Sequence, residues 1–230
     1  MKIITSFGTR RVKRQQECLA SWLMHDHAVT AVQTISRPTH AKTYLAKMRK
    51  AFPGVEFVLV ADKPNPFGRP TCPPITSMVR LIENEPALVV NSDIEIASEF
   101  DHWGEVPGNT LRVGIRHDQA EDGSLRLRKY GIDVFEITPA MVEHLPDIGF
   151  AFGCPVWDYW VVYALSEAGF KVSADHNPIF LHEEHTRAWD DKAQSIGVEI
   201  MRNRYGIRQR DLTQYILRET NRFDIAAATG

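Results

Sequence analysis

The first half of the chain alternates between short apolar runs and longer segments with helical spacing. Four runs typical of buried strands cover residues 2–7, 29–35, 55–60 and 87–90. The segments between them, in which apolar residues recur at intervals of three and four, are residues 12–24, 41–52 and 75–82. This order predicts an α/β fold, a three-layer α/β/α arrangement with a mostly parallel central sheet.

The second half is less regular, but it carries the same two kinds of segment. Strands are expected at residues 112–115, 134–137 and 170–174, with the polar segment 117–129 between the first two. Apolar faces with helical spacing indicate a helix that begins at Pro155 and two later helices over residues 190–204 and 211–219. We expect these last helices to pack on the same core.

Length and composition favour one soluble globular unit. The 230 residues carry a net charge of -2, which demands no polyanionic partner. Cys18, Cys72 and Cys154 are far apart, so they predict reduced thiols and a cytoplasmic setting rather than a disulfide framework or a paired-cysteine zinc site. No apolar stretch approaches the length of a membrane span, and the first residues show a strand pattern rather than a signal peptide.

An acidic patch follows the fourth apolar run. Residues 91–95 read Asn-Ser-Asp-Ile-Glu, so Asp93 and Glu95 place two carboxylates, expected on one strand face, just after a buried strand. Ligands of parallel α/β sheets collect at the carboxyl ends of strands, and oxygen ligands suit Mg²⁺ or Mn²⁺ held against phosphate oxygens. The patch therefore predicts a metal-and-diphosphate centre, with a solvated strand end as the alternative.

A second candidate is the acid at the end of the segment 153–158. Pro155 at a helix start would place Asp158 in the first turn, where the helix dipole favours the ionised form. An ionised carboxylate beside aromatic side chains suits a general base that deprotonates an acceptor hydroxyl. The alternative is an acid that only stabilises its own helix. Trp157 and Trp160 are expected in the core.

Two further segments carry groups that suit a metal and a diphosphate. His182 and His185 are three residues apart and can converge on one ion if the chain turns, an interpretation that gains weight only if Asp93 lies nearby. Gly8 and Arg10 lie between the first strand and the first helix, where backbone amides and cations can hold a diphosphate. Solvated polar residues are the alternative for both segments.

Taken together, these segments resemble GT-A-type nucleotide-sugar glycosyltransferases. The resemblance covers residues 1–190 and rests on motifs in the family's order: the strand-loop 4–8, the strand ending at Asp62, Asn91-Ser92-Asp93 as a variant of Asp-x-Asp, Trp157-Asp158, and the pair His182 and His185. It implies a catalytic domain over 1–190, with a donor-binding half at 1–100 and an acceptor-side half at 101–190. Residues 191–230 would form a helical extension packed on that domain.

By this resemblance each motif has an expected role. Asp93 would be the principal metal ligand, His182 or His185 the distal one, and Asp158 the base. The residues expected around the donor are Thr5, Phe7, Gly8, Arg10, Asp62, Arg80, Asn91 and Ser92. Because Asn91 replaces the first acid of the usual motif, Glu95 stays open as a further metal ligand. The segment around Asp158 has one acid where many relatives carry two.

The implied activity is metal-dependent transfer of a sugar from a nucleotide-sugar donor to an acceptor hydroxyl, with inversion. A UDP-sugar is the expected donor, and a retaining outcome stays open. Two other functions also stay open: a metal-dependent nucleotidyltransferase or phosphohydrolase, and a nucleotide- or glycan-binding module without turnover. The acceptor is left open between a glycan, a protein and a modified nucleobase.

Overall fold

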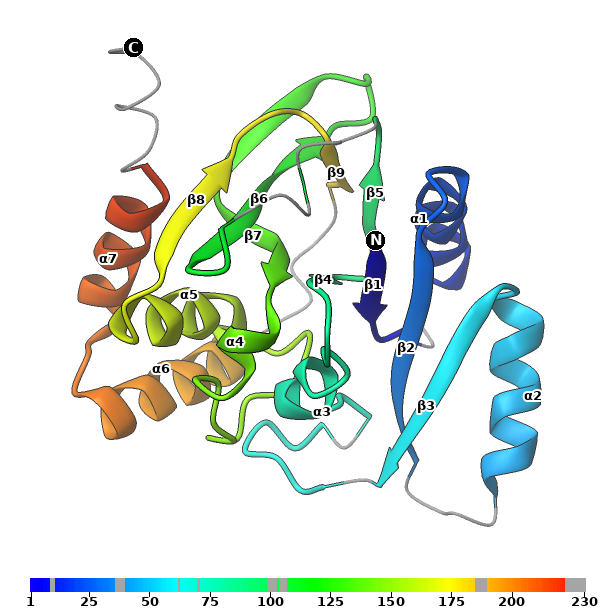
Figure 1. Cartoon of the computed structure of the whole chain (residues 1–230), viewed down its shortest axis with the longest axis horizontal. Coiled ribbons are helices and arrows are strands. Elements are labelled where there is room, and N and C mark those ends of the chain that lie inside the picture. Colours follow the sequence, from blue (N-terminus) through cyan, green and yellow to red (C-terminus); the bar gives the residue numbers. More distant parts are fainter. Residues whose placement is uncertain are drawn as a thin grey trace.

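The computed structural model describes residues 1–8, 11–35, 40–61, 63–69, 71–98, 103, 107–184 and 190–221. Within these residues nine strands form one mixed sheet, in the order β3-β2-β1-β4-β7-β6-β9-β5, with β8 paired to β6. Most of the strand pairs are parallel, and helices cover both faces of the sheet (Figure 1). The predicted three-layer α/β/α fold class is confirmed.

The amino-terminal half forms the continuous parallel part of the sheet. Its strands are β1 (Lys2–Thr5), β2 (Ala28–Ile35), β3 (Val55–Ala61) and β4 (Ala87–Val90). The helices that connect them are α1 (Val12–Met24), α2 (Ala41–Ala51) and α3 (Ile75–Val79). Because β1 pairs with both β2 and β4 in parallel, the carboxyl ends of these strands meet at one edge, where α/β sheets bind ligands.

Alternate side chains of the parallel strands pack on opposite faces of the sheet. On β4, Leu88 and Val90 join the apolar cluster under α1 and α2, which also contains Trp22. Val89 joins the larger apolar cluster on the other face. All residues of β4 are buried. The strand that precedes the acidic patch is therefore held from both sides.

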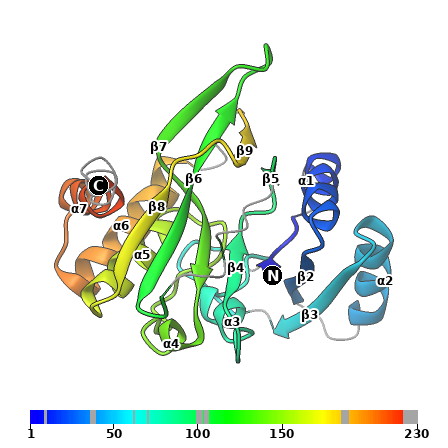
Figure 2. The same cartoon turned by 45° about the horizontal axis from the view of Figure 1, so that its top comes forward.

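β6 (Thr110–Gln119) and β7 (Leu125–Ile137) form one long antiparallel hairpin. The prediction that the polar segment 117–129 separates two short strands is wrong, because most of that segment belongs to the hairpin. Residues 121–130 are exposed, so they lack the alternation of apolar and polar residues that marks a half-buried strand. The tip of the hairpin projects beyond the rest of the molecule (Figure 2).

Three short strands, β5 (Ile94–Ile96), β8 (Lys171–Asp175) and β9 (Phe180–Glu183), complete the sheet beyond β6. β9 runs parallel to the second half of β6 and antiparallel to β5. The segment around His182 is therefore a strand, and His182 pairs with Ile94 in the ladder. This pairing brings His182 next to the acidic patch.

The remaining helices are α4 (Pro139–Val142), α5 (Trp157–Glu167), α6 (Asp191–Tyr205) and α7 (Gln209–Asn221). α5 begins two residues after Pro155, later than predicted, because Val156 has a left-handed backbone. Ala193 and Met201 of α6 and Leu212 of α7 belong to the same apolar cluster as α5. Within the described part of the chain, no helix has the length and apolarity that a membrane span needs.

Candidate active site

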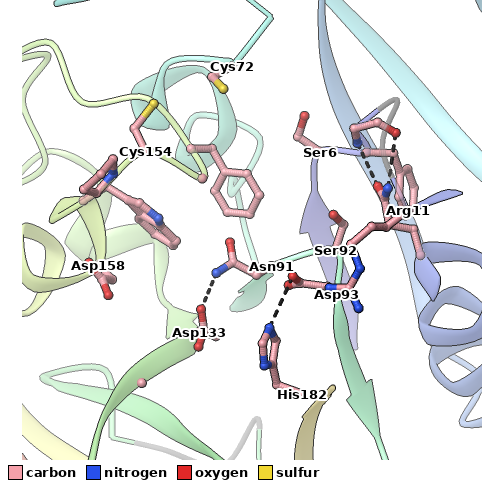
Figure 3. A pocket seen from close by; sticks show the side chains of 18 of the residues that line it. Ser6, Arg11, Cys72, Asn91, Ser92, Asp93, Asp133, Cys154, Asp158 and His182 are labelled. Atoms are coloured by element: carbon pink, nitrogen blue, oxygen red, sulfur yellow. Dashed lines mark hydrogen bonds and ion pairs between the residues drawn. The ribbon is translucent and has the colours of Figure 1, made fainter. Parts of the chain in front are cut away.

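A pocket of ≈1170 Å³ opens at the carboxyl ends of β1, β2 and β4. One wall comes from the residues after β1 and from the start of α1, and the opposite wall comes from the turn before α5 and the loop before α3. Residues 91–93, the β6–β7 hairpin and His182 of β9 lie between them (Figure 3). Asp93, Asp158 and His182 therefore line one shared cavity.

The side chains of Asp93 and His182 face each other at one end of this cavity (Figure 3). Asp93 lies in the tight turn between β4 and β5, and its Oδ2 atom is 3.5 Å from Nε2 of His182. The other ring nitrogen of His182, Nδ1, is 3.1 Å from Oδ1 of Asp118 on β6. A carboxylate on the far nitrogen is the arrangement that orients metal-binding histidines in proteins.

The donor set at Asp93 and His182 fits a divalent cation. A carboxylate oxygen suits Mn²⁺ or Mg²⁺, and an imidazole nitrogen can complete such a shell. Among the described residues, no group of three or more His, Cys, Asp and Glu side chains is arranged to hold a metal ion. Two protein ligands leave positions for phosphate oxygens and water, so these residues suit a cation that is shared with a diphosphate.

Asp133 of β7 links the acidic patch to the α5 side of the pocket. Its carboxylate accepts hydrogen bonds from Nδ2 of Asn91 and, at 3.0 Å, from the guanidinium of Arg116. Its backbone carbonyl also accepts from the Asn91 N–H group at 3.1 Å, which extends the ladder between β4 and β7 past Val90. Asn91 is therefore oriented by Asp133 through both its backbone and its side chain.

Asp158 lies in the first turn of α5, as predicted, and lines the pocket on the side away from Asp93 (Figure 3). Burial, with the negative charge of Asp133 as the second cause, raises the pKa of Asp158 from 3.8 to about 7. The net shift is opposite to the one expected from the helix dipole, because burial outweighs it. A carboxyl group with a pKa near neutrality suits a general base.

The turn that carries Asp158 has an unusual backbone and a close neighbour. Val156 has a φ of 74°, a left-handed conformation that is rare for a β-branched residue. A Cβ atom on Gly197 of α6 would lie 2.7 Å from the carbonyl oxygen of Pro155 and 2.9 Å from Cγ2 of Val156. Because position 197 has no side chain, α6 packs directly on the turn and supports its strained conformation.

The opposite wall combines aromatic rings with polar groups. Phe7 stacks on Phe52 with ring centroids 4.0 Å apart, and the Gly8 N–H group donates to the side chain of Gln15 at 2.7 Å. The Tyr44 hydroxyl and the Gln33 side chain lie 2.9 Å apart, and both residues line the pocket. Apolar surface with a few fixed polar groups suits a flat heterocycle with a polar edge.

Acidic side chains outnumber basic ones in the described lining of the pocket. The acids are Asp93, Asp118, Asp133, Asp158 and Glu184, and the arginines are Arg11, Arg116 and Arg128. Each arginine is paired with an acid: Arg116 with Asp118 and Asp133, Arg128 with Asp118, and Arg11 with Glu183. A diphosphate would therefore be repelled here unless a cation accompanies it.

The structure brings seven residues predicted from the sequence to the pocket: Phe7, Gly8, Asn91, Ser92, Asp93, Asp158 and His182. Three other predicted residues do not line it. Thr5 is fully buried and its hydroxyl donates to the Val90 carbonyl at 2.7 Å, and Arg80 is exposed at the end of α3. Arg10, Asp62 and His185 lie outside the described residues.

Glu95 is the third predicted residue that does not line the pocket. It forms a salt bridge of 2.9 Å with Arg14 of α1. Asp93 and Glu95 were expected on one strand face, but Asp93 is in the turn and β5 begins only at Ile94. The two-residue repeat of a strand therefore does not relate these two carboxylates.

Sequence reasoning missed Asp133, Arg116 and Asp118, which belong to no short motif. One signal was present for Asp133, because a single acid stands between Ile132 and Val134 in an apolar run. A carboxylate in a buried strand is rare unless it is paired. Its partners are distant in sequence, so only the strand order reveals them.

No protein-family model and no curated protein sequence matches the chain. Solved structures with a similar fold include S. aureus TarS 1-349, at 13% identity and a TM-score of 0.49, over 100% of this chain and 73% of that chain. Another is the galactosyltransferase LgtC in complex with donor and acceptor sugar analogs. It is 10% identical, with a TM-score of 0.46, over 91% of this chain and 98% of that chain. A third is a putative glucose-1-phosphate thymidylyltransferase from Bacillus anthracis. It is 10% identical, with a TM-score of 0.40, over 85% of this chain and 94% of that chain. The likeness concerns the fold.

Proposed function

We propose that the protein is a metal-dependent glycosyltransferase that moves a sugar from a nucleotide-sugar donor to an acceptor hydroxyl. The observation that carries this proposal is the shared pocket, in which Asp93 and His182 lie together and Asp158 lines the other side. One end offers groups for a diphosphate with its cation, and the other offers a base. Holding both reactants in one cavity is what a transfer reaction requires.

The donor would lie along the wall that follows β1. Phe7, Gln33 and Tyr44 provide apolar and polar surface for its base, and we expect a uracil base. Asp93 and His182 would hold Mn²⁺ or Mg²⁺, which neutralises the charge of the diphosphate when it is bound. The acid-rich lining supports this requirement, since the arginines of the pocket are already paired with acids.

The acceptor would lie between Asp158 and the hairpin. Tyr130 of β7 lines the pocket and is 48% exposed, so its ring is available to an acceptor. Asp158 would take the proton of the acceptor hydroxyl, because a group with a pKa of about 7 is partly ionised at neutral pH. The acceptor oxygen forms a bond to the anomeric carbon as the bond to the diphosphate breaks. Attack from the side opposite the leaving group inverts the configuration.

The test is product analysis with a panel of UDP-, GDP- and dTDP-sugars and Mn²⁺, in the presence of glycan, peptide and DNA acceptors. We expect release of a nucleoside diphosphate from at least one donor, loss of that release with EDTA, and loss of turnover with retained donor binding in Asp158→Asn. Release of pyrophosphate or cleavage of a phosphate ester would instead support a nucleotidyltransferase or a phosphohydrolase. Donor binding without turnover in the wild type would support a binding module.

A further inference from the structure

Two cysteines that are 82 positions apart by their numbers meet on the pocket wall. Cys72 lies in the loop before α3 and Cys154 lies in the turn before α5. Their segments are joined by backbone contacts: an isolated bridge pairs Pro74 with Ala151, and the Phe152 N–H group donates to the Pro73 carbonyl at 2.8 Å. The two segments are therefore fixed against each other.

The antiparallel bridge places the side chains of Cys72 and Cys154 near each other. Both residues line the pocket, and Figure 3 draws their side chains on the same side of it. Both are free cysteines, with Cys72 half-buried and Cys154 buried. The third cysteine, Cys18, is a buried residue of α1 and belongs to the cluster on the other face of the sheet.

The surroundings of the two thiols make Cys72 the more reactive one. The neighbouring side chain of Cys154, together with the positive charge of Arg69, lowers the pKa of Cys72. The neighbouring side chain of Cys72 and burial raise the pKa of Cys154. Burial raises the pKa of Cys18 to about 12. The thiolate is the reactive form, so Cys72 should react first.

We propose that Cys72 and Cys154 form a site of reversible thiol oxidation, which reacts with a hydroperoxide and closes as a Cys72–Cys154 disulfide. The Cys72 thiolate attacks the peroxide, the O–O bond breaks, and Cys72 becomes a sulfenic acid while the second oxygen leaves as water or an alcohol. The Cys154 sulfur then attacks the Cys72 sulfur, the S–O bond breaks, and water leaves. Two thiols lose two electrons and the hydroperoxide gains them.

Closure of this disulfide would act on the turn that carries Asp158. Cys154 lies two residues before Val156, whose left-handed backbone is already strained, and four before Asp158. A covalent link to the loop before α3 would restrain that turn. We expect the oxidised protein to turn over more slowly. This effect on turnover rests on the proposed function, whereas formation of the disulfide does not depend on that function.

The experiment is oxidation of the folded, fully reduced protein with hydrogen peroxide, followed by proteolysis without reductant and mass spectrometry. We expect one linked peptide pair that contains Cys72 and Cys154 and disappears with dithiothreitol. Cys18→Ser should form the same link, and Cys72→Ser should form none. In Cys154→Ser, Cys72 should remain as a sulfenic acid that dimedone traps.

Absence of the link in the folded wild type, or links that involve Cys18 equally, would overturn the proposal. Circular dichroism of each variant checks that it is folded. Turnover of the oxidised and re-reduced protein is measured separately, with Cys72→Ser as the peroxide-insensitive control. A disulfide that forms in a protein without transferase activity would refute the proposed function and leave the oxidation site in place.

Discussion

His182 and Asp93 face each other across the pairing of β9 with β5, with Nε2 and Oδ2 3.5 Å apart. The register of β9 produces this relationship. His182 pairs with Ile94 on one side and with Asp118 on the other. A slip of one residue would turn the imidazole to the opposite face of the sheet. The cation site therefore depends on how three strands from distant parts of the sequence align.

Asp118→Asn should weaken cation binding without removing a ligand. Asp118 faces Nδ1 of His182 and thereby orients the ring, and loss of such a partner typically costs about 10- to 100-fold in metal affinity. Titration of Mn²⁺ followed by electron paramagnetic resonance measures this loss. Arg128→Gln is the matched control, because it removes another partner of Asp118 without touching His182. Equal Mn²⁺ affinity in Asp118→Asn and the wild type would contradict the assignment.

Asp158→Asn should abolish turnover and stabilise the fold at high pH. Loss of a general base costs about 10²- to 10⁴-fold in rate. The pKa of Asp158 is about 7 in the folded protein and 3.8 without its surroundings, so the folded state binds the proton more tightly. The contribution of this group to the free energy of unfolding therefore falls as pH rises from 3.8 to about 7.

An asparagine at position 158 carries no such penalty, so its Tm should exceed that of the wild type at pH 8. Each kcal/mol corresponds to about 2–4 °C in Tm for a chain of this size. The difference should shrink at pH 5, where the wild-type carboxyl group is protonated. Thermal unfolding followed by circular dichroism at both pH values is the measurement. A lower Tm for the variant at pH 8 would argue against a half-buried carboxylate that destabilises the fold when it is ionised.

Asp133→Asn should move the pH dependence of kcat/KM. In the wild type, activity should rise with pH as Asp158 ionises, with a midpoint at about 7. The charge of Asp133 raises the pKa of Asp158, so its removal should shift this midpoint to lower pH. Glu184→Gln, which removes another acid from the lining, should leave the midpoint in place. A midpoint that stays fixed or moves upward in Asp133→Asn would exclude this coupling.

Gly197→Ala, on α6, should distort the turn before α5, on which α6 packs. The added methyl group would collide with the Pro155 carbonyl and with Val156, and such overpacking costs about 1–3 kcal/mol. We expect a lower kcat with donor affinity unchanged, because Asp158 moves while Asp93 and His182 do not. Gly108→Ala is the control, since a Cβ atom there meets nothing within 4 Å. Weakened donor binding in Gly197→Ala would show that the substitution disturbs the donor side of the pocket as well, contrary to this prediction.

The strands and helices of the first half were predictable because each buries apolar residues that recur at the regular interval of its element. The helix at 12–24 has the same bounds in the structure, and the strand at 87–90 is likewise confirmed. The β6–β7 hairpin was not predictable, because residues near its tip are exposed on both faces and show no alternation. Two residues that are two positions apart share a face only when both lie in one strand. Asp93 lies in the turn before β5, so Glu95 does not line the pocket with it and pairs with Arg14 instead.

Except for His182, which lies within β9, the predicted site residues that reach the pocket lie just after a strand or in the first turn of a helix, so their positions could be inferred from those elements. Asn91, Ser92 and Asp93 follow β4, and Asp158 stands in the first turn of α5. Asp133 and Asp118 could not be inferred in this way. Their roles depend on the pairing of β7 with β4 and of β6 with β9, which joins residues far apart in the sequence.

The central claim is that Asp93 and His182 hold a cation that binds the diphosphate of the donor. The most direct measurement is isothermal titration of UDP, GDP and dTDP with Mn²⁺ and with EDTA. We predict that at least one of them binds the wild type with Mn²⁺ and far more weakly with EDTA. Asp93→Asn should bind weakly in both conditions, whereas Glu95→Gln, which alters a carboxylate outside the pocket, should behave as the wild type. Nucleotide binding that is equal with Mn²⁺ and EDTA, or that is unchanged in Asp93→Asn, would contradict the account.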